Sequence, residues 1–469
     1  MKRAAGLLSV VLAACSTLGP DYKRPEMALP AQYTEPSPAE GPAVAPDWWR
    51  LYSDATLDDL VASAQNTNAD VRLAAARVQE AEGVLREARA AFWPDVTAGY
   101  SASRSRVSAT GVPAPPPGTI IRPSHQLLVS TNFELDFWGR FARATEAARA
   151  NLLGNQLGQD VVALTLAGGI AQAYFALRSL DAQIRVLENS IRVRRDSLDI
   201  TKARLDAGLA PELDLYQAQG ALSDALVQKR DAERSRALIE HQLAQLTGRL
   251  DLKLAAGDVF ALPLVPLPPA GLPSALLERR PDIRQAEEAL VAANAQIGIA
   301  RAALFPTLSL TAGAGVQSGE LDTLLTTGAR IWSLGFGLAL PIFDAGRREA
   351  RVDQARARRE QAVAGYQRAV ESGFREVADA LVNAQQTGAS EAELLERLQA
   401  ARNALELSTL RYESGYSPYL EVLYAQRTAN DAELAYVRNR QARLAFSVDL
   451  MKALGGGWNP AQKNAGSGS

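Results

Sequence analysis

The sequence predicts a mainly α-helical protein that also carries four β-strands of membrane-spanning length. Three observations support this fold class. Apolar residues recur with a seven-residue period over long stretches, four shorter stretches alternate apolar residues with small or polar ones, and the second half of the chain repeats the first. A sustained seven-residue period is typical of helices that pack as coiled coils, and a period of two is typical of strands.

The composition suits narrow seams between helices better than a thick globular core. The 469 residues are 47% hydrophobic, yet only 6% are aromatic, and alanine is the commonest residue. Small side chains allow helices to approach closely along a seam. The length by itself leaves several domains or one elongated domain open.

The charge and the residue counts exclude several classes of function. A net charge of −2 provides no basic surface for nucleic acid, and one cysteine excludes a disulfide framework or a cysteine-cluster metal site. The two histidines, His125 in an expected loop and His241 on a polar helix, are interpreted as surface residues. The sequence has no nucleotide-binding loop, zinc-protease motif or serine-hydrolase motif. We therefore predict no catalytic residue, no cofactor and no metal site.

Residues 1–14 are predicted to be a signal peptide that precedes a lipidated cysteine. A basic start is followed by an apolar stretch too short to span a bilayer of ~30 Å as a helix. Leu12–Cys15 resembles the lipobox of bacterial lipoproteins, and Ser16 at the next position resembles lipoproteins sorted to the outer membrane. An ordinary signal peptide with a chance cysteine is the alternative, but Cys15 is the only cysteine of the chain. Several acyl chains on Cys15 would give stable anchoring, since each buried CH₂ contributes ~0.8 kcal/mol.

Two helical stretches are longer than any globular domain is wide. They cover 140–206 and 347–413, and at 1.5 Å per residue each would be ~100 Å long. Two pairs of shorter helical stretches would each match one long helix if they stacked end to end. These pairs are about 54–92 with 212–248, and about 274–304 with 418–454.

The chain is predicted to consist of two repeats. Residues 203–214 align with residues 410–421 without a gap, and an offset of about 207 residues also relates Gly139-Arg140 to Gly346-Arg347. The predicted organisation is a lipidated tether at 15–53, a first repeat at 54–261, a proline-rich linker at 262–273, a second repeat at 274–455 and a disordered tail at 456–469.

Four alternating stretches have the length of tilted transmembrane strands. A soluble antiparallel sheet with one buried face is the common cause of such alternation. Here the second face is rich in Gly, Ser and Thr, and the helices offer no layer of large side chains to cover the first, which favours lipid contact. A sheet in lipid must close and the smallest barrels have eight strands, so we predict a homotrimer with twelve strands. The strands are expected at about 94–105, 126–138, 306–316 and 331–342, with loops 105–126 and 317–330 pointing outward.

Several short motifs follow one another along the chain: 19–25, Trp48-Trp49, Phe92-Trp93-Pro94, 133–136 with Gly139-Arg140, 278–283, 341–343 with Gly346-Arg347, and 411–415. Through these motifs, nearly the whole mature chain resembles the outer-membrane efflux proteins of the TolC family, in the lipoprotein branch named after NodT and OprM. The resemblance implies a trimer with a twelve-stranded barrel in the outer membrane, continued by a helical canal across the periplasm. It also implies a passive duct through which an inner-membrane efflux pump, coupled by a periplasmic adaptor protein, expels drugs or other small molecules.

The same resemblance assigns roles at the two turns between long and short helices. It implies that Tyr412 and Asp214 form a closing bond between neighbouring helices, and that Glu421 contributes to an acidic ring at the canal entrance. Three such carboxylates would favour cations; the plainer interpretation of Glu421 is a solvated helix residue. Ser417 stands where some relatives carry an arginine of a second closing bond. Adaptor hairpins are expected to dock at tips formed by Gly208, Leu209, Ala210 and Pro211 and by Gly415, Tyr416, Ser417 and Pro418.

Capping alone also explains the glycines and prolines of these tips, because Gly ends a helix in a left-handed conformation and Pro begins the next. Two further functions stay open at this point. The same architecture could serve a type I protein-secretion system, and a periplasmic coiled-coil scaffold without a pore would keep the seven-residue periods. The scaffold would leave the four strands unexplained.

Overall fold

The computed structural model describes residues 17–35, 44–110, 116, 120–271 and 273–458. The predicted signal peptide and Cys15 lie outside these residues. The chain divides into two units. The first unit comprises Met1–Glu26, Val78–Asn155 and Ala286–Tyr366, and the second comprises Met27–Arg77, Gln156–Gln285 and Gln367–Ser469.

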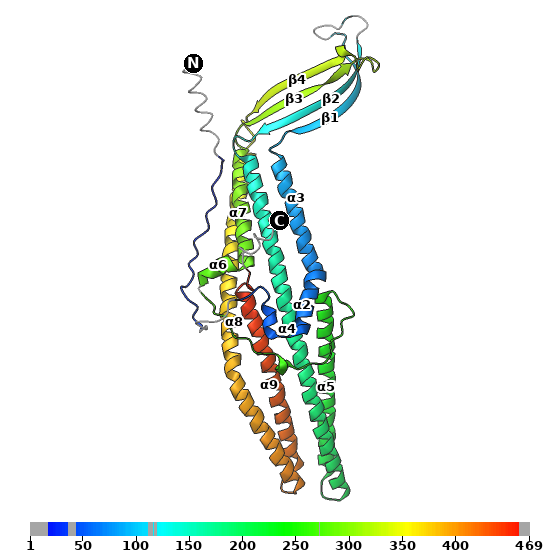
Figure 1. Ribbon diagram of the computed structural model, residues 1–469, viewed down its shortest axis with the longest axis vertical. Helices are drawn as coiled ribbons and strands as arrows, with labels where there is room; N and C mark the ends of the chain where they lie inside the picture. Colours follow the sequence, from blue (N-terminus) through cyan, green and yellow to red (C-terminus); the bar gives the residue numbers. More distant parts are fainter. Residues whose placement is uncertain (1–16, 36–43, 111–115, 117–119, 272, 459–469) are drawn as a thin grey trace. The chain divides into compact units, whose positions relative to one another are not determined.

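Helices make up most of the described chain, together with one β-sheet (Figure 1). With 3₁₀ helices written η, the order is η1 (Trp48–Tyr52), α2 (Ala55–Thr67), α3 (Ala69–Ala90), β1 (Asp95–Arg106), β2 (Ile121–Leu135), α4 (Arg140–Asp206), α5 (Glu212–Thr247), η2 (Val259–Ala261), η3 (Pro273–Ala275), α6 (Leu276–Arg279), α7 (Pro281–Ala302), β3 (Thr307–Ser318), η4 (Thr327–Ala329), β4 (Arg330–Ala339), α8 (Arg347–Glu413) and α9 (Tyr419–Ala453).

The two long helices have the predicted bounds. Both α4 and α8 contain 67 residues, and the predicted ranges 140–206 and 347–413 are confirmed. Their sustained apolar period keeps one stripe facing neighbouring helices along the whole length. Within the described residues, α4 is the one helix long and apolar enough to cross a membrane by composition. Half of its apolar stretch is buried inside the protein.

The sheet of the first unit is antiparallel, in the order β1-β2-β3-β4 (Figure 1). Continuous pairing places alternate residues of all four strands on a common face; Val129 pairs with Ala314, and Ala314 pairs with Trp332. This face is apolar but bare, since Trp332 is 81% exposed and Leu334 is 76% exposed. A soluble sheet would bury such a face against its own chain. The strands β1 and β4 form the two edges, each paired on one side within the described chain.

The strands differ from the predicted ones at their ends. β2 begins at Ile121 instead of 126, because its pairing with β1 continues until Ile121 lies opposite Arg106. β2 ends at Leu135 instead of 138, where a turn leads into α4. β4 ends at Ala339 instead of 342, and Pro341 shortly after it has no N–H for a ladder bond.

The predicted loop position of His125 is wrong, because this residue lies in β2 opposite Ala102. Its Nδ1 atom and the hydroxyl of Tyr100 are 2.8 Å apart, and the two rings stack with centroids 6.3 Å apart. Pro123 and the polar residues around it interrupt the apolar alternation, so the sequence did not predict a strand at His125. Pairing with β1 extends β2 over these residues. His241 is exposed on α5, as predicted.

In the second unit, part of the predicted tether belongs to the apolar core. Trp48 and Tyr52 of η1 are fully buried. The ring of Tyr52 meets Phe175 edge-on with centroids 4.8 Å apart, and its hydroxyl lies 2.7 Å from Oγ of Ser447 on α9. Burial of a large apolar side chain contributes about 1.5–3 kcal/mol. The tether prediction is therefore wrong for residues 48–52, where the aromatic side chains hold a short helix in the core.

Residues 17–25, at the start of the described chain, are bound to helices of the first unit. Leu18 donates its N–H to the carbonyl of Trp138 at 3.1 Å. Arg143 of α4, which is buried, donates to the Leu18 carbonyl at 3.2 Å and to Asp21 at 2.8 Å. Gly19 has φ +103°, and a Cβ on it would lie 2.6 Å from the Cα of Gly298 on α7. We call residues 17–25 the strap.

Glu287 on α7 holds the rest of the strap. Its carboxylate accepts hydrogen bonds from the hydroxyl of Tyr22 at 3.0 Å and from the guanidinium of Arg24 at 2.7 and 2.9 Å. Asn294, further along α7, donates to the carbonyl of Pro20 at 2.8 Å. The strap is extended, as a tether would be, but it is fixed to the helices of its unit by hydrogen bonds along its length.

The predicted tail and linker pack in the second unit. Trp458 donates its Nε1–H to Asp160 at 3.0 Å, so the prediction of a disordered tail is wrong for residues 456–458. Residues 459–469 lie outside the described residues. In the linker, Leu262 is buried, and its carbonyl accepts a hydrogen bond from Arg440 at 2.6 Å.

Candidate functional site

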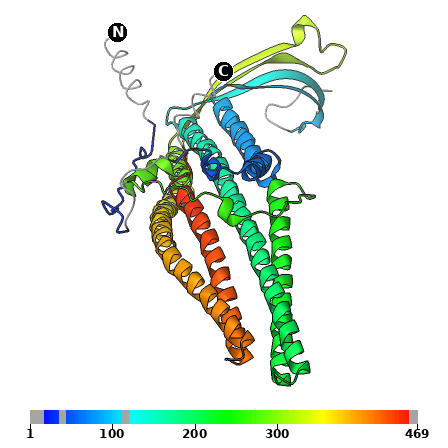
Figure 2. The same ribbon diagram turned by 60° about the horizontal axis from the view of Figure 1, so that its bottom comes forward.

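The candidate site consists of the two turns that join α4 to α5 and α8 to α9, which come forward in Figure 2. Both turns have the same hydrogen bonds. Gly208 has φ +72° and the next N–H, that of Leu209, donates to the carbonyl of Arg204 at 2.7 Å. Gly415 has φ +79°, and the N–H of Tyr416 donates to the carbonyl of Arg411 at 2.8 Å. Each glycine ends a long helix in a Schellman motif.

The prolines begin the two shorter helices. Pro211 and Pro418 are the N-cap residues of α5 and α9, both with extended backbone. Their carbonyls accept the N–H groups of Asp214 and Glu421, each at 3.1 Å. Capping therefore accounts for the predicted tip residues Gly208, Pro211, Gly415 and Pro418 as turn formers.

The tips also expose large apolar side chains, which capping does not require. Leu209 is 70% exposed and Tyr416 is 80% exposed, one on each turn. Further exposed apolar side chains follow in the first two turns of the shorter helices: Leu213 and Tyr216 of α5, and Leu420 and Tyr424 of α9. Contiguous exposed apolar surface on a soluble part of a protein is typical of an interaction site.

Tyr412 lies next to the turns, but its side chain is buried and is not part of the exposed surface of the tips. It is 5% exposed and packs with Ala218, Tyr419 and Val422. Its ring meets that of Tyr419 edge-on with centroids 5.5 Å apart, and its hydroxyl lies 3.5 Å from Oγ1 of Thr201 on α4. Burial raises the pKa of Tyr419 to about 12, with the nearby Tyr412 acting in the same direction. Tyr412 thus joins α4, α5, α8 and α9 within one chain.

Arg204 is a residue of this site that the sequence did not single out. Its guanidinium donates to the carbonyls of Tyr412 at 2.8 Å and Glu413 at 3.3 Å, and its Cζ atom lies 4.8 Å from the centre of the Tyr412 ring. A cation beside the last carbonyls of a helix is favoured by the helix dipole. Arg204 of α4 therefore clasps the end of α8. The sequence offered one signal, because Arg204 aligns with Arg411 between the two repeats.

The other residues predicted to act in closure of the canal, Asp214 and Glu421, and the neighbouring Ser417 have different surroundings. Within the described residues, no hydrogen bond joins Asp214 to Tyr412. Burial raises the pKa of Asp214, and the charge of Arg204 opposes this rise. Glu421 is exposed, and its carboxylate lies 3.3 Å from Nε of Arg411 in an ion pair. Ser417 has a buried Oγ atom with no hydrogen-bond partner within the described chain.

A polar cavity lies behind the turns, between α4, α8 and α9. Its volume is about 230 Å³, and Arg194, Gln426 and Asn430 line it. Gln426 donates to Oγ of Ser197 at 2.7 Å, and Arg194 donates to the carbonyl of Ala221. Burial lowers the pKa of Arg194, although Asp224 and other anionic groups act in the opposite direction. The cavity is therefore lined by polar side chains together with apolar ones such as Val193 and Leu405.

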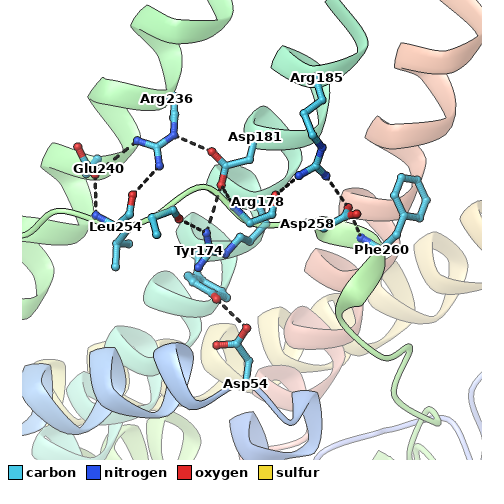
Figure 3. Close-up of polar contacts among 12 residues, drawn as sticks. Asp54, Tyr174, Arg178, Asp181, Arg185, Arg236, Glu240, Leu254, Asp258 and Phe260 are labelled. Carbon is cyan, nitrogen blue, oxygen red and sulfur yellow. Dashed lines mark hydrogen bonds and ion pairs between the residues drawn. The ribbon is translucent and has the colours of Figure 1, made fainter. Parts of the chain in front are cut away.

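Figure 3 shows a separate polar network in the second unit, centred on Asp181 of α4. The Asp181 carboxylate accepts hydrogen bonds from Arg236 at 2.6 Å, from the N–H of Gly257 at 2.9 Å and from Arg178 at 3.2 Å. Arg178 also donates to the carbonyl of Ala255 at 2.6 Å. Together these bonds fix the segment after α5 onto α4 and α5.

The carboxylates of this network each have hydrogen-bond donors or positive charges beside them. Burial alone would raise the pKa of Glu240, but the N–H of Leu254 and the cations of Lys253 and Arg236 hold it below its ordinary value. Asp54 caps α2 and accepts a hydrogen bond from the hydroxyl of Tyr174 at 2.7 Å. The network has structural partners for each charge, and among the described residues no cluster of His, Cys, Asp and Glu could hold a metal ion.

The comparisons with known proteins agree with this arrangement of strands, long helices and turns. The family model described as outer membrane efflux protein matches residues 60–249 and 272–456. The chain belongs to the outer membrane efflux protein family. It is 34% identical to the probable efflux pump outer membrane protein SepC of Pseudomonas putida, over 96% of each chain. It is also 34% identical to the cation efflux system protein CusC of Escherichia coli, over 96% of this chain and 97% of the relative.

The fold is that of solved members of the family. A crystal structure of CusC superposes with a TM-score of 0.85 at 31% identity, over 94% of this chain and all of the other. The predicted relationship to outer-membrane efflux proteins is thereby confirmed, and the chain is an outer-membrane efflux channel component by family.

Proposed function

We propose that the chain forms a homotrimeric duct of a tripartite efflux system. The observation that carries the proposal is the sheet of the first unit, which has a bare apolar face and two edge strands that are each paired on one side within the described chain. Such a sheet is stable in lipid only if it closes, and four strands are too few to close. Three copies would supply twelve strands, with the face rich in Gly, Ser and Thr lining the lumen and the apolar face meeting lipid. The matching of two segments by the family model is in keeping with an internal repeat.

The tips supply the surface at which a periplasmic adaptor protein would dock. Leu209 and Tyr416 project apolar side chains into solvent on rigid, doubly hydrogen-bonded turns. An inner-membrane efflux pump would provide the energy, because the chain has no nucleotide-binding loop. Under this proposal the duct is passive and requires no cofactor.

Closure of the duct is proposed to depend on Tyr412, Asp214 and Glu421. The buried Tyr412 and the clasp of Arg204 hold the ends of α4 and α8 together within one chain. The closing bond would join Tyr412 of α8 to Asp214 of α5, between neighbouring helices. Glu421 would contribute one carboxylate per copy to a ring at the entrance. Its ion pair with Arg411 reduces the charge that the ring would present to passing ions.

Deletion of the gene is expected to increase the susceptibility of the cell to toxic small molecules, because export across the outer membrane would be lost. The measurement is the minimal inhibitory concentration of a panel of drugs, solvents and metal ions, with complementation by the wild-type gene as the control. Unchanged susceptibility together with loss of a secreted protein from the medium would instead favour the type I secretion system.

Cys15 is proposed to carry the lipid that anchors the chain in the outer membrane. The seated strap supports this, because residues 17–25 lead from Cys15 along helices of the unit that contains the sheet. Cys15→Ala is expected to abolish labelling by radioactive palmitate, since the thioether is the attachment point of the diacylglycerol. Ser16→Ala is the matched control and should retain the label. Undiminished labelling of Cys15→Ala would contradict the assignment.

A further inference from the structure

The apolar face of the sheet carries charge at one end only. Arg104 and Arg106 of β1 and Arg330 of β4 are exposed. The register places them on the apolar face, because direct partners in an antiparallel pair point to the same side. Their direct partners are Pro123, Ile121 and Val316, which share that face with Leu127, Val129, Ala314 and Trp332.

No acidic residue lies on this face of the four described strands. Toward the other end of the strands, the face consists of apolar residues such as Leu135, Leu308 and Leu338. The arginines lie where β1 and β2, and β3 and β4, are joined to each other, rather than where the strands join helices (Figure 1). A lipid-facing arginine costs about 2–4 kcal/mol at the middle of a bilayer but only about 0–1 kcal/mol near its surface. The arginines therefore belong at a membrane surface.

Aromatic side chains adjoin the arginines on the same face. Tyr100 is 54% exposed and Trp332 is 81% exposed. Tyr100 pairs with Leu127, in the same cross-strand row as Arg330, and its hydroxyl is bonded to His125. Tyr and Trp are enriched where hydrocarbon meets headgroups. These two aromatic residues, in neighbouring cross-strand rows, mark the level at which hydrocarbon ends, and the arginines lie at or beyond it.

We propose that Arg104, Arg106 and Arg330 form a collar that binds the phosphates of a phosphorylated glycolipid in the outer leaflet of the membrane. The inference rests on the proposed barrel. The guanidinium fork matches phosphate oxygens in pairs of hydrogen bonds. In a closed ring, β1 of one copy adjoins β4 of the next, so Arg104 and Arg106 share a surface with Arg330 of the adjoining copy. Three such surfaces would surround the barrel.

The test measures how much lipid A the full-length protein retains. The detergent-extracted trimer is incubated with equal amounts of lipid A and phosphatidylethanolamine and purified again, and the bound lipids are counted by mass spectrometry. The variant R104Q/R106Q/R330Q is expected to retain at least about tenfold less lipid A than the wild type, because its charge-assisted bonds to phosphate are lost. R122Q is the matched control, because Arg122 lies at the same end of the sheet opposite Ser105, on the other face.

Two further measurements keep the inference falsifiable if the triple variant does not fold. R104K/R106K/R330K should retain lipid A within a few-fold of the wild type, and the wild type should retain about tenfold less of a dephosphorylated lipid A. Equal retention of phosphorylated and dephosphorylated lipid A would overturn the inference, as would equal losses in the triple variant and R122Q. Heat-modifiable trimers of the wild type report on the barrel separately, so their absence identifies failure of the proposed function itself.

Discussion

Replacement of Asp181 by Ala is expected to destabilise the second unit by about 3–5 kcal/mol. The side chain of Asp181 is 1% exposed and accepts hydrogen bonds from two guanidinium groups and a backbone N–H (Figure 3). Without it, Arg178 loses its ion-pair partner in a mostly buried site, Arg236 is left to pair with Glu240, and the N–H of Gly257 loses its acceptor. An uncompensated buried charge costs far more than an exposed ion pair contributes.

Asp59→Ala is the control for this prediction. Asp59 also accepts a bond from an arginine, Arg249 at 2.6 Å, but its side chain is 65% exposed. Its loss should change stability by no more than about 1 kcal/mol. Because a large membrane protein unfolds irreversibly, the thermal midpoint and the resistance to protease are compared at one heating rate. Equal midpoints for Asp181→Ala and Asp59→Ala would show that the network does not hold the segment after α5.

Loss of the proposed closing bond between Tyr412 and Asp214 is expected to open the duct. The double variant Tyr412→Phe with Asp214→Ala is expected to raise single-channel conductance in planar bilayers, because the proposed closing bond would be lost. A hydrogen bond to a charged group contributes about 1.5–3 kcal/mol, which shifts an open–closed equilibrium by about tenfold or more for each copy. Arg204→Gln is expected to act in the same direction, since it removes the clasp that holds the end of α8 on α4.

The pH dependence of conductance gives a second measurement of this gate. Burial raises the pKa of Asp214, against the opposing charge of Arg204, so acid neutralises Asp214 at a higher pH than an exposed aspartate. A neutral carboxyl accepts a weaker bond from a tyrosine hydroxyl. Wild-type conductance should therefore rise as the pH falls through this raised pKa, and the double variant should not respond. Tyr416→Phe, on the exposed tip, is the control and should match the wild type. Unchanged conductance in the double variant would remove Tyr412 and Asp214 from the gate while leaving the fold untouched.

The long helices were predictable from the sequence because their determinants are local. α4 and α8 keep an apolar period along their whole length, and each ends at a glycine that the sequence shows plainly. The strands were predictable in number and approximate place for the same reason. Their ends were not, because β2 is extended by pairing with β1 rather than by its own alternation.

The rest depends on contacts between distant segments. The residues near Trp48 in the sequence do not indicate that its helix packs into a core built by α4 and α9. The predicted site is incomplete for a related reason: Arg204 acts on main-chain carbonyls of Tyr412 and Glu413, and any residue has a carbonyl, so no pattern of side chains marks the partner. The roles assigned to Tyr412, Asp214 and Glu421 come from resemblance, and they stay predictions until conductance is measured.

The seat of the strap has a consequence for the order of events during export. Residues 17–25 leave the ribosome and cross the inner membrane early, yet their partners Glu287, Asn294 and Gly298 follow more than 260 residues later, with Asn294 separated from Pro20 by 274 positions. Because a chain emerges from its N-terminus, the strap can first meet Trp138 and Arg143, whereas its partners on α7 become available only after most of the protein has crossed. An acyl chain on Cys15 would therefore hold the growing polypeptide at a membrane surface before the contacts with α7 could form. Complete binding of the strap to α7 would then require that the second half of the chain has crossed the inner membrane.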